Sequence, residues 1–163
     1  MTDLDKVIEE AEIICKKKGG RFTLKRKRIL LKLLSKNKAL SPYEIADDYN
    51  VDYESKMPVM SIYRILDFLE KMNLVHKINA INKYMACSHI TCSHKHKSPQ
   101  FLICRNCSNI KEVYLEDKLV EDLHLEAKKY GFQLHKTYSE ISCLCNKCRR
   151  SVKIMPQARK LDF

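Results

Sequence analysis

Apolar residues in the first part of the chain recur at helical spacing. One stripe starts at Leu4 and stops at Gly19-Gly20, after the lysines at 16–18 have placed positive charge at the negative end of the helix dipole. A second stripe follows Thr23, a residue suited to capping a helix, and separates its leucines and isoleucine from its lysines and arginines. The pattern predicts two amphipathic helices.

Two further helices are marked by their first residues. Ser41-Pro42, with Glu44 at the third helical position, has the form of a capping box and predicts a short helix over residues 43–50. Pro58 opens a longer helix that we expect to run through Leu74. Its inward stripe consists of Ile62, Ile65, Leu66, Leu69 and Met72.

The apolar pattern changes from helical to alternating after this fourth helix. Val75 to Ile78 and Lys83 to Ala86 predict a two-stranded hairpin. Helices followed by such a hairpin are typical of a winged helix-turn-helix, in which one helix enters the major groove of DNA. Ser61 and Arg64 share the outer face of the fourth helix, next to Tyr63, so this helix is the candidate for DNA contact.

The second half of the chain predicts a small unit of mixed helix and strand. Strands are expected at Phe101 to Ile103, Ile110 to Tyr114 and Phe132 to Ser142, and a helix at Glu116 to Tyr130. The basic tail from Arg149 onward is expected to be disordered in part. The fold class is therefore α+β, with a winged helix followed by a small α/β unit.

Two Cys-x-x-Cys pairs, Cys104/Cys107 and Cys145/Cys148, enclose this second unit. Four thiolates complete the tetrahedral shell of Zn²⁺, and each two-residue gap lets one turn offer two sulfurs to one ion. Disulfides are the alternative, but no signal peptide pattern opens the chain, so we expect a reducing cytoplasmic setting and a structural zinc. Cys143 offers a third thiol near the second pair, and we favour Cys145 because of its two-residue gap.

The distribution of charge along the chain predicts a binding partner. The 163-residue chain has a formal net charge of +11, and residues 16–38 contain eleven lysines or arginines and no acid. A basic block of this kind attracts nucleic acid, although a merely solvated helix face is the alternative. No apolar run approaches the length of a membrane span, so no membrane partner is expected.

Between the two halves, residues 87–96 contain five cysteines and histidines, a density that core packing does not require. We therefore expect a metal-binding hinge. The predicted organisation is a DNA-binding domain at 1–86, the hinge at 87–98, a dimerisation domain at 99–150 and a basic tail at 151–163.

The order of these parts resembles the ferric uptake regulator family of bacterial metal-sensing repressors, from about Val7 to Cys148. The resemblance rests on the winged helix, the His/Cys-rich hinge, Phe-Leu-Ile-Cys-Arg-Asn-Cys at 101–107 and the closing Cys-x-x-Cys. Ile-Tyr-Arg-Ile-Leu-Asp-Phe-Leu at 62–69 and Tyr-Met-Ala-Cys at 84–87 are most similar to its zinc uptake regulator (Zur) branch.

This resemblance implies two zinc ions per subunit and assigns residues to each. The structural site would comprise Cys104, Cys107, Cys145 and Cys148. The regulatory site would comprise His76, Cys87, His96 and Glu112, with His94 as the alternative to His96. The candidate DNA contacts are Tyr43, Ser61, Tyr63, Arg64, Lys25 and Arg28. His135 lies near a position that similar proteins use for a further metal, but its role stays open.

The resemblance also implies a function: a zinc-responsive homodimer that represses metal-uptake genes on double-stranded operator DNA, with no small-molecule substrate. An iron or peroxide sensor of the same family is the alternative, which the thiol of Cys87 disfavours because oxygen ligands suit iron better. A zinc enzyme is a third hypothesis, but the chain has no His-x-Glu or His-Glu-x-x-His pattern.

Overall fold

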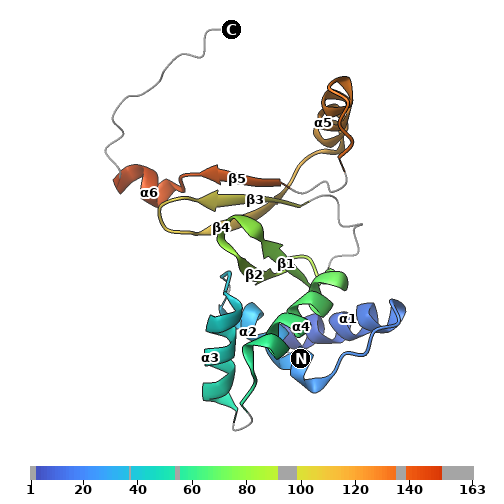
Figure 1. The fold of residues 1–163 in the computed structure, drawn as a ribbon, viewed down its shortest axis with the longest axis vertical. Coiled ribbons are helices and arrows are strands. Elements are labelled where there is room, and N and C mark those ends of the chain that lie inside the picture. The colour runs from blue at the N-terminus through green and yellow to red at the C-terminus, as the bar shows by residue number, and fades with distance from the viewer. Residues whose placement is uncertain (1–2, 37, 54–55, 92–98, 135–138, 152–163) are drawn as a thin grey trace. The chain divides into compact units, whose positions relative to one another are not determined.

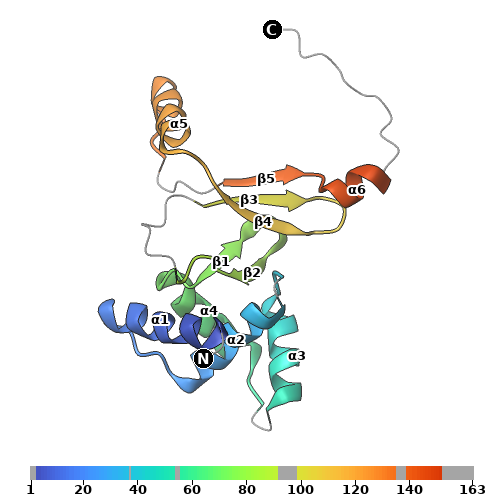
Figure 2. The same cartoon turned by 180° about the vertical axis from the view of Figure 1, so that it is seen from behind.

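In the computed structural model the chain forms two compact units, residues 1–97 and 98–163 (Figures 1 and 2). The structure describes residues 3–36, 38–53, 56–91, 99–134 and 139–151. None of the helices in these ranges is long and apolar enough to cross a membrane.

The first unit contains four helices and a two-stranded wing. The elements are α1 (Asp3–Lys17), α2 (Leu24–Lys36), α3 (Pro42–Asp52), α4 (Val59–Lys71), β1 (Val75–Ile78) and β2 (Lys83–Ala86), with a 3₁₀ turn, η1 (Asn79–Ile81), between the strands. β1 and β2 pair antiparallel, and an isolated bridge between Leu40 and Tyr84 ties the segment before α3 to the wing. The predicted helices and both strands of the hairpin are confirmed.

One core holds this unit together. Its fully buried side chains come from every helix and from the wing: Ala11, Ile29, Leu30, Leu33, Ile45, Tyr49, Ile62, Leu66, Leu69, Leu74 and Tyr84. Burying a leucine or isoleucine of this kind contributes roughly 1.5–3 kcal/mol. The stripe predicted for the fourth helix therefore faces the core at Ile62, Leu66 and Leu69, while Ile65 is half-buried.

The helix ends show why these elements have their bounds. At α3 the predicted capping box is present: the hydroxyl of Ser41 accepts a hydrogen bond from the Glu44 N–H, and the Glu44 carboxylate accepts one from the Ser41 N–H. At α4 the expectation of a helix through Leu74 is wrong. Asn73 adopts φ 61°, and the Leu74 N–H donates to the Leu69 carbonyl, which closes the helix after Lys71.

The second unit is a three-stranded sheet with two helices. Its elements are β3 (Pro99–Cys104), β4 (Ile110–Tyr114), α5 (Asp117–Lys129), β5 (Ser139–Cys143) and α6 (Asn146–Ser151). The strand order is β4-β3-β5, and the central β3 pairs antiparallel with β4 and parallel with β5. The buried Gln100 on β3 accepts hydrogen bonds from the backbone and hydroxyl of Ser139, which anchors the start of β5.

One expectation for this unit needs correction. The third strand does not begin at Phe132, because residues 132–134 lie outside the sheet and the Phe132 N–H instead donates to the Ala127 carbonyl, which closes α5. Arg149 and Arg150, at the start of the basic stretch, lie in the short helix α6. Residues 152–163 lie outside the described part of the chain.

The helix α5 stands apart from the sheet of its own unit in both views (Figures 1 and 2). Although it is amphipathic, none of its residues, all of which the structure describes, is buried. Leu119, Leu123 and Leu125 are each more than half exposed. Leu119 and Leu123, four residues apart, share one face of the helix, and an exposed apolar face of this kind is typical of a surface that associates with another chain.

Candidate functional site

The four cysteines of the two Cys-x-x-Cys pairs come together in the second unit. Cys104 ends β3, Cys107 lies in the turn before β4, Cys145 follows β5 and Cys148 is in α6. Parallel pairing of β3 with β5 places Cys104 opposite Cys143, so both turns leave the same end of the sheet. Strands far apart in sequence thereby present two pairs of thiols to one point.

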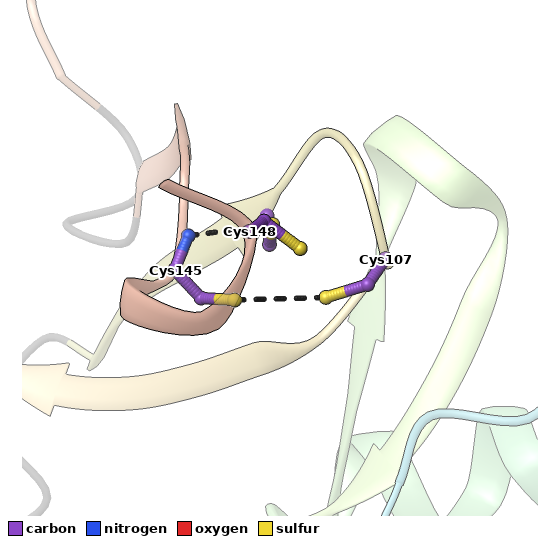
Figure 3. A group of neighbouring side chains, drawn as sticks. Cys107, Cys145 and Cys148 are labelled. Atoms are coloured by element: carbon purple, nitrogen blue, oxygen red, sulfur yellow. Dashed lines mark hydrogen bonds between the residues drawn. The ribbon is translucent and has the colours of Figure 1, made fainter. Parts of the chain in front are cut away.

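The geometry of this cluster fits zinc. The four Sγ atoms lie within 4.8 Å of one another, and Figure 3 shows the sulfurs of Cys107 and Cys145 pointing toward each other, 3.7 Å apart. A tetrahedral zinc with Zn–S bonds of about 2.3 Å requires sulfurs separated by about 3.8 Å. Cys143 is not a member of this four-sulfur group.

The backbone around the cluster favours thiolates. The N–H of Cys145, 3.4 Å from the sulfur of Cys104, and the N–H of Cys107 lower the pKa of Cys104 to about 6. The N–H of Cys148 lowers the pKa of Cys145 in the same way. For Cys107 the N–H of Asn109 lowers the pKa, but hydrogen bonds with Cys148 and Cys104 outweigh it and raise the pKa to about 12. The backbone donors thus favour the thiolate form of Cys104 and Cys145, which is the form that ligates a metal.

Two further side chains that can ligate a metal, a histidine and a cysteine, lie close together in the first unit. His76 lies on β1, and Cys87 follows β2 directly, where its N–H donates to the Leu74 carbonyl across the hairpin at 3.0 Å. A ring nitrogen of His76 and the sulfur of Cys87 are within 4.8 Å of each other. Cys87 is buried. The wing therefore places one imidazole and one thiol side by side, while His94, His96 and His135 lie outside the described residues.

Glu112 lies on β4 of the second unit, and its carboxylate is buried. The hydroxyl of Tyr114 donates a hydrogen bond to it at 2.7 Å. Sequence reasoning missed Tyr114, although the two-residue spacing on a strand places both side chains on the same face. A hydrogen bond of this kind orients a carboxylate that ligates a metal.

The candidate DNA contacts all lie on the helices of the first unit. Arg64 on α4 is exposed, and Ser61 and Tyr63 beside it are half-buried. Tyr43, in the first turn of α3, is 63% exposed. Lys25 on α2 is also exposed.

Arg28 on α2 differs from Lys25 in its surroundings. Its guanidinium lies 4.0 Å from the centroid of the Tyr53 ring. The Arg28 side chain is half-buried, whereas Lys25 is exposed. A stacked guanidinium is held in place by its aromatic partner as well as by any phosphate it meets. The contact of Arg28 with DNA stays a prediction.

Charge is distributed unevenly among these helices. α2 and α4 have no acidic residue in the first turn, whereas α1, α3 and α5 do. Part of the basic block is used within the fold, because Lys32 and Lys36 on α2 form ion pairs with Asp52 and Asp48 on α3. Because the first turns of α2 and α4 contain no acidic side chain, the positive N-terminal ends of their helix dipoles favour the approach of phosphates.

Together, these features define a winged-helix protein with a four-thiol cluster suited to zinc. Residues 17–142 match the model of the ferric uptake regulator family, and the chain belongs to that family, as the sequence predicted. The zinc uptake regulation protein of Escherichia coli (strain K12) is 34% identical over 149 residues, covering 90% of this chain and 84% of that protein. The ferric uptake regulation protein of Helicobacter pylori (strain ATCC 700392 / 26695) is 27% identical over 149 residues, covering 91% and 95%.

Solved structures give the same result. A zinc uptake regulator complexed with zinc and DNA is similar with a TM-score of 0.79 and 27% identity, covering 93% of this chain and 98% of that chain. The structure of holo XcZur is similar with a TM-score of 0.71 and 31% identity, covering 88% and 96%.

Proposed function

We propose that this protein is a zinc-responsive repressor that binds operator DNA as a homodimer in the cytoplasm and has no enzymatic activity. The observation that carries the proposal is the pairing of His76 with Cys87 at the wing, directly beyond the helix that bears Arg64. The similarity to zinc uptake regulators, one of them in complex with zinc and DNA, supports the same function.

We further propose two zinc ions per subunit. The four-cysteine cluster would hold a structural ion, because four thiols fill a tetrahedral shell and leave no open position for catalysis. The regulatory ion would be held by His76, Cys87, His96 and Glu112. A set with nitrogen, sulfur and oxygen donors is common for zinc, and the thiol of Cys87 disfavours an iron sensor.

The chain's own contacts indicate how the regulatory site acts on DNA binding. The Cys87 N–H bonds to Leu74, and the N–H of Leu74 bonds to Leu69 in the last turn of α4. A restraint on Cys87 is therefore transmitted through one residue to the helix that carries Arg64. When bound, zinc supplies a cross-link among its ligands, and ligands drawn from both units would hold the units in one arrangement.

A titration tests this function. Metal-stripped full-length protein is titrated with Zn²⁺ or Fe²⁺ while fluorescence anisotropy follows binding to a palindromic AT-rich duplex. We expect zinc to tighten DNA binding about 5- to 150-fold, and DNA to tighten zinc binding by the same factor, because coupling is reciprocal. Equal DNA affinity with and without zinc would contradict the proposal, and a response to iron alone would favour the iron sensor.

Variants localise the response. Cys87→Ser should lose one zinc per subunit and the zinc dependence of DNA binding, yet keep the dimer, because the four-cysteine cluster is untouched. Cys143→Ser is the matched control, because Cys143 belongs neither to the four-cysteine cluster nor to the His76/Cys87 pair. The DNA binding of this variant should depend on zinc as that of the wild type does. If Cys87→Ser kept an unchanged zinc response, the regulatory site would have to be sought elsewhere.

A further inference from the structure

The exposed residues of α4 form a single outward stripe. They are Met60, Arg64, Asp67 and Lys71, spaced four, three and four residues apart, and they lie opposite the buried stripe of Ile62, Leu66 and Leu69. Three of the four are charged, as a solvated helix face requires. Met60 is the exception, since its side chain is apolar and 65% exposed.

The neighbouring Met57 has the same side chain as Met60 but a different environment. Met57 is buried, and its N–H donates to the side chain of Asn50 at 2.7 Å, which anchors the loop before α4. Three residues later, Met60 lies in the first turn of the helix and points away from the same core. Nothing in the described core uses Met60, so its apolar side chain is available to a partner.

The position of Met60 relative to Arg64 indicates the partner. Four residues of helix correspond to about 6 Å along the axis, and base pairs are spaced by about 3.4 Å. A helix that places Arg64 against a base edge therefore brings Met60 within one or two base pairs of it. The first turn of α4 carries no acid that would repel the phosphates on either side.

We infer that Met60 is a specificity-determining residue that packs against the 5-methyl group of a thymine, one or two base pairs from the base that Arg64 reads. The thioether side chain has no hydrogen-bond donor, and thymine is the base that presents a methyl group in the major groove. Apolar contact is the main distinction that Met60 can make there, because its thioether sulfur accepts hydrogen bonds only weakly. This inference rests on the proposed DNA-binding function.

The test begins with a duplex selected from a randomised library by the zinc-loaded wild-type protein. Each thymine of that duplex is then replaced in turn by deoxyuridine, which removes one methyl group and leaves base pairing intact. We expect one position per half-site at which the wild type loses about fourfold in affinity, the value of one buried methyl group. Met60→Ala should bind the unmodified duplex with the same loss and become insensitive to deoxyuridine at that position.

Two controls separate specificity from folding. Val51→Ala removes an apolar side chain that is 85% exposed on α3, and it should keep the wild-type response to deoxyuridine. Met60→Leu should restore the discrimination, and the zinc content and salt dependence of Met60→Ala should be unchanged. If Met60→Ala loses affinity at the same deoxyuridine positions as the wild type, Met60 does not contact a thymine methyl group. That result would contradict this inference and leave the proposed DNA-binding function standing. If the wild type selects no sequence at all, the proposed function falls with it.

Discussion

The ammonium group of Lys83 in β2 lies 3.0 Å from the carboxylate of Glu44, which also caps the first turn of α3. One carboxylate therefore links the wing to the helix that presents Tyr43. The N–H of Ser41 and, to a smaller extent, Lys83 lower the pKa of Glu44 to about 2.

This relationship predicts a pH-dependent contribution to stability. Because the pKa of Glu44 is lowered on folding, the unfolded chain binds the proton more readily, and the stabilisation is present above the unfolded pKa of about 4.3. It is lost as the pH falls from there toward 2. Glu44→Ala should reduce the free energy of unfolding by about 1 kcal/mol at pH 7, and the difference from the wild type should shrink below pH 4. Urea unfolding at several pH values measures it, with the exposed Asp47→Ala as control.

The sulfur geometry predicts which thiols hold the structural zinc. Cys145→Ser should lose that zinc and the dimer, and the second unit should fold poorly, because metal binding energy at such a site is folding energy. Cys143→Ser should retain both. Zinc content and light scattering on the purified variants decide between the two residues, and the opposite ranking would reassign the site to Cys143.

The exposed leucines of α5 predict the dimer surface. Leu123 is 53% exposed in the isolated chain, and a second copy packed on this face would bury it. Leu123→Asp should therefore convert the dimer into a monomer, because the interface would have to bury an unpaired charge. The structural zinc should stay, since α5 contributes no cysteine. Lys128→Asp, an exposed polar position of the same helix, should remain dimeric in sedimentation analysis. A dimeric Leu123→Asp protein would exclude this face as the interface.

The helix surfaces predict two classes of DNA contact. Arg64→Ala should weaken binding to a selected duplex by about 1 to 3 kcal/mol and leave binding to random DNA nearly unchanged. Lys25→Ala should weaken both alike and reduce the slope of log affinity against log salt by about 1. Arg28→Ala should in addition cost about 0.5 to 1 kcal/mol of stability, because the stacking on Tyr53 is lost. Equal losses for Arg64→Ala on both DNAs would reassign it to a phosphate contact.

The chain's local patterns accounted for much of this architecture. The wing strands agree residue for residue with the runs predicted at 75–78 and 83–86, because strand-forming residues and the asparagines that bound them act over a few neighbours. The capping box at Ser41 is equally local. The Cys-x-x-Cys spacing predicted two turns that each offer two sulfurs, and the family followed from the order of these parts.

Other features depended on contacts between distant segments. The late start of β5 follows from its anchoring to Gln100 on β3, across 39 residues of chain. The parallel pairing of β3 with β5 brings Cys145, rather than Cys143, among the other three sulfurs.

By itself, the sequence determined the elements, the ligand types and the family, since each depends on the identity and spacing of near neighbours. The tertiary structure decided which sulfurs meet, that Arg28 stacks on Tyr53, and that Met60 faces outward while Met57 is buried. Two methionines three residues apart carry the same chemistry in the sequence. Only the packing of α4 on its neighbours assigns one to the core and the other to the surface.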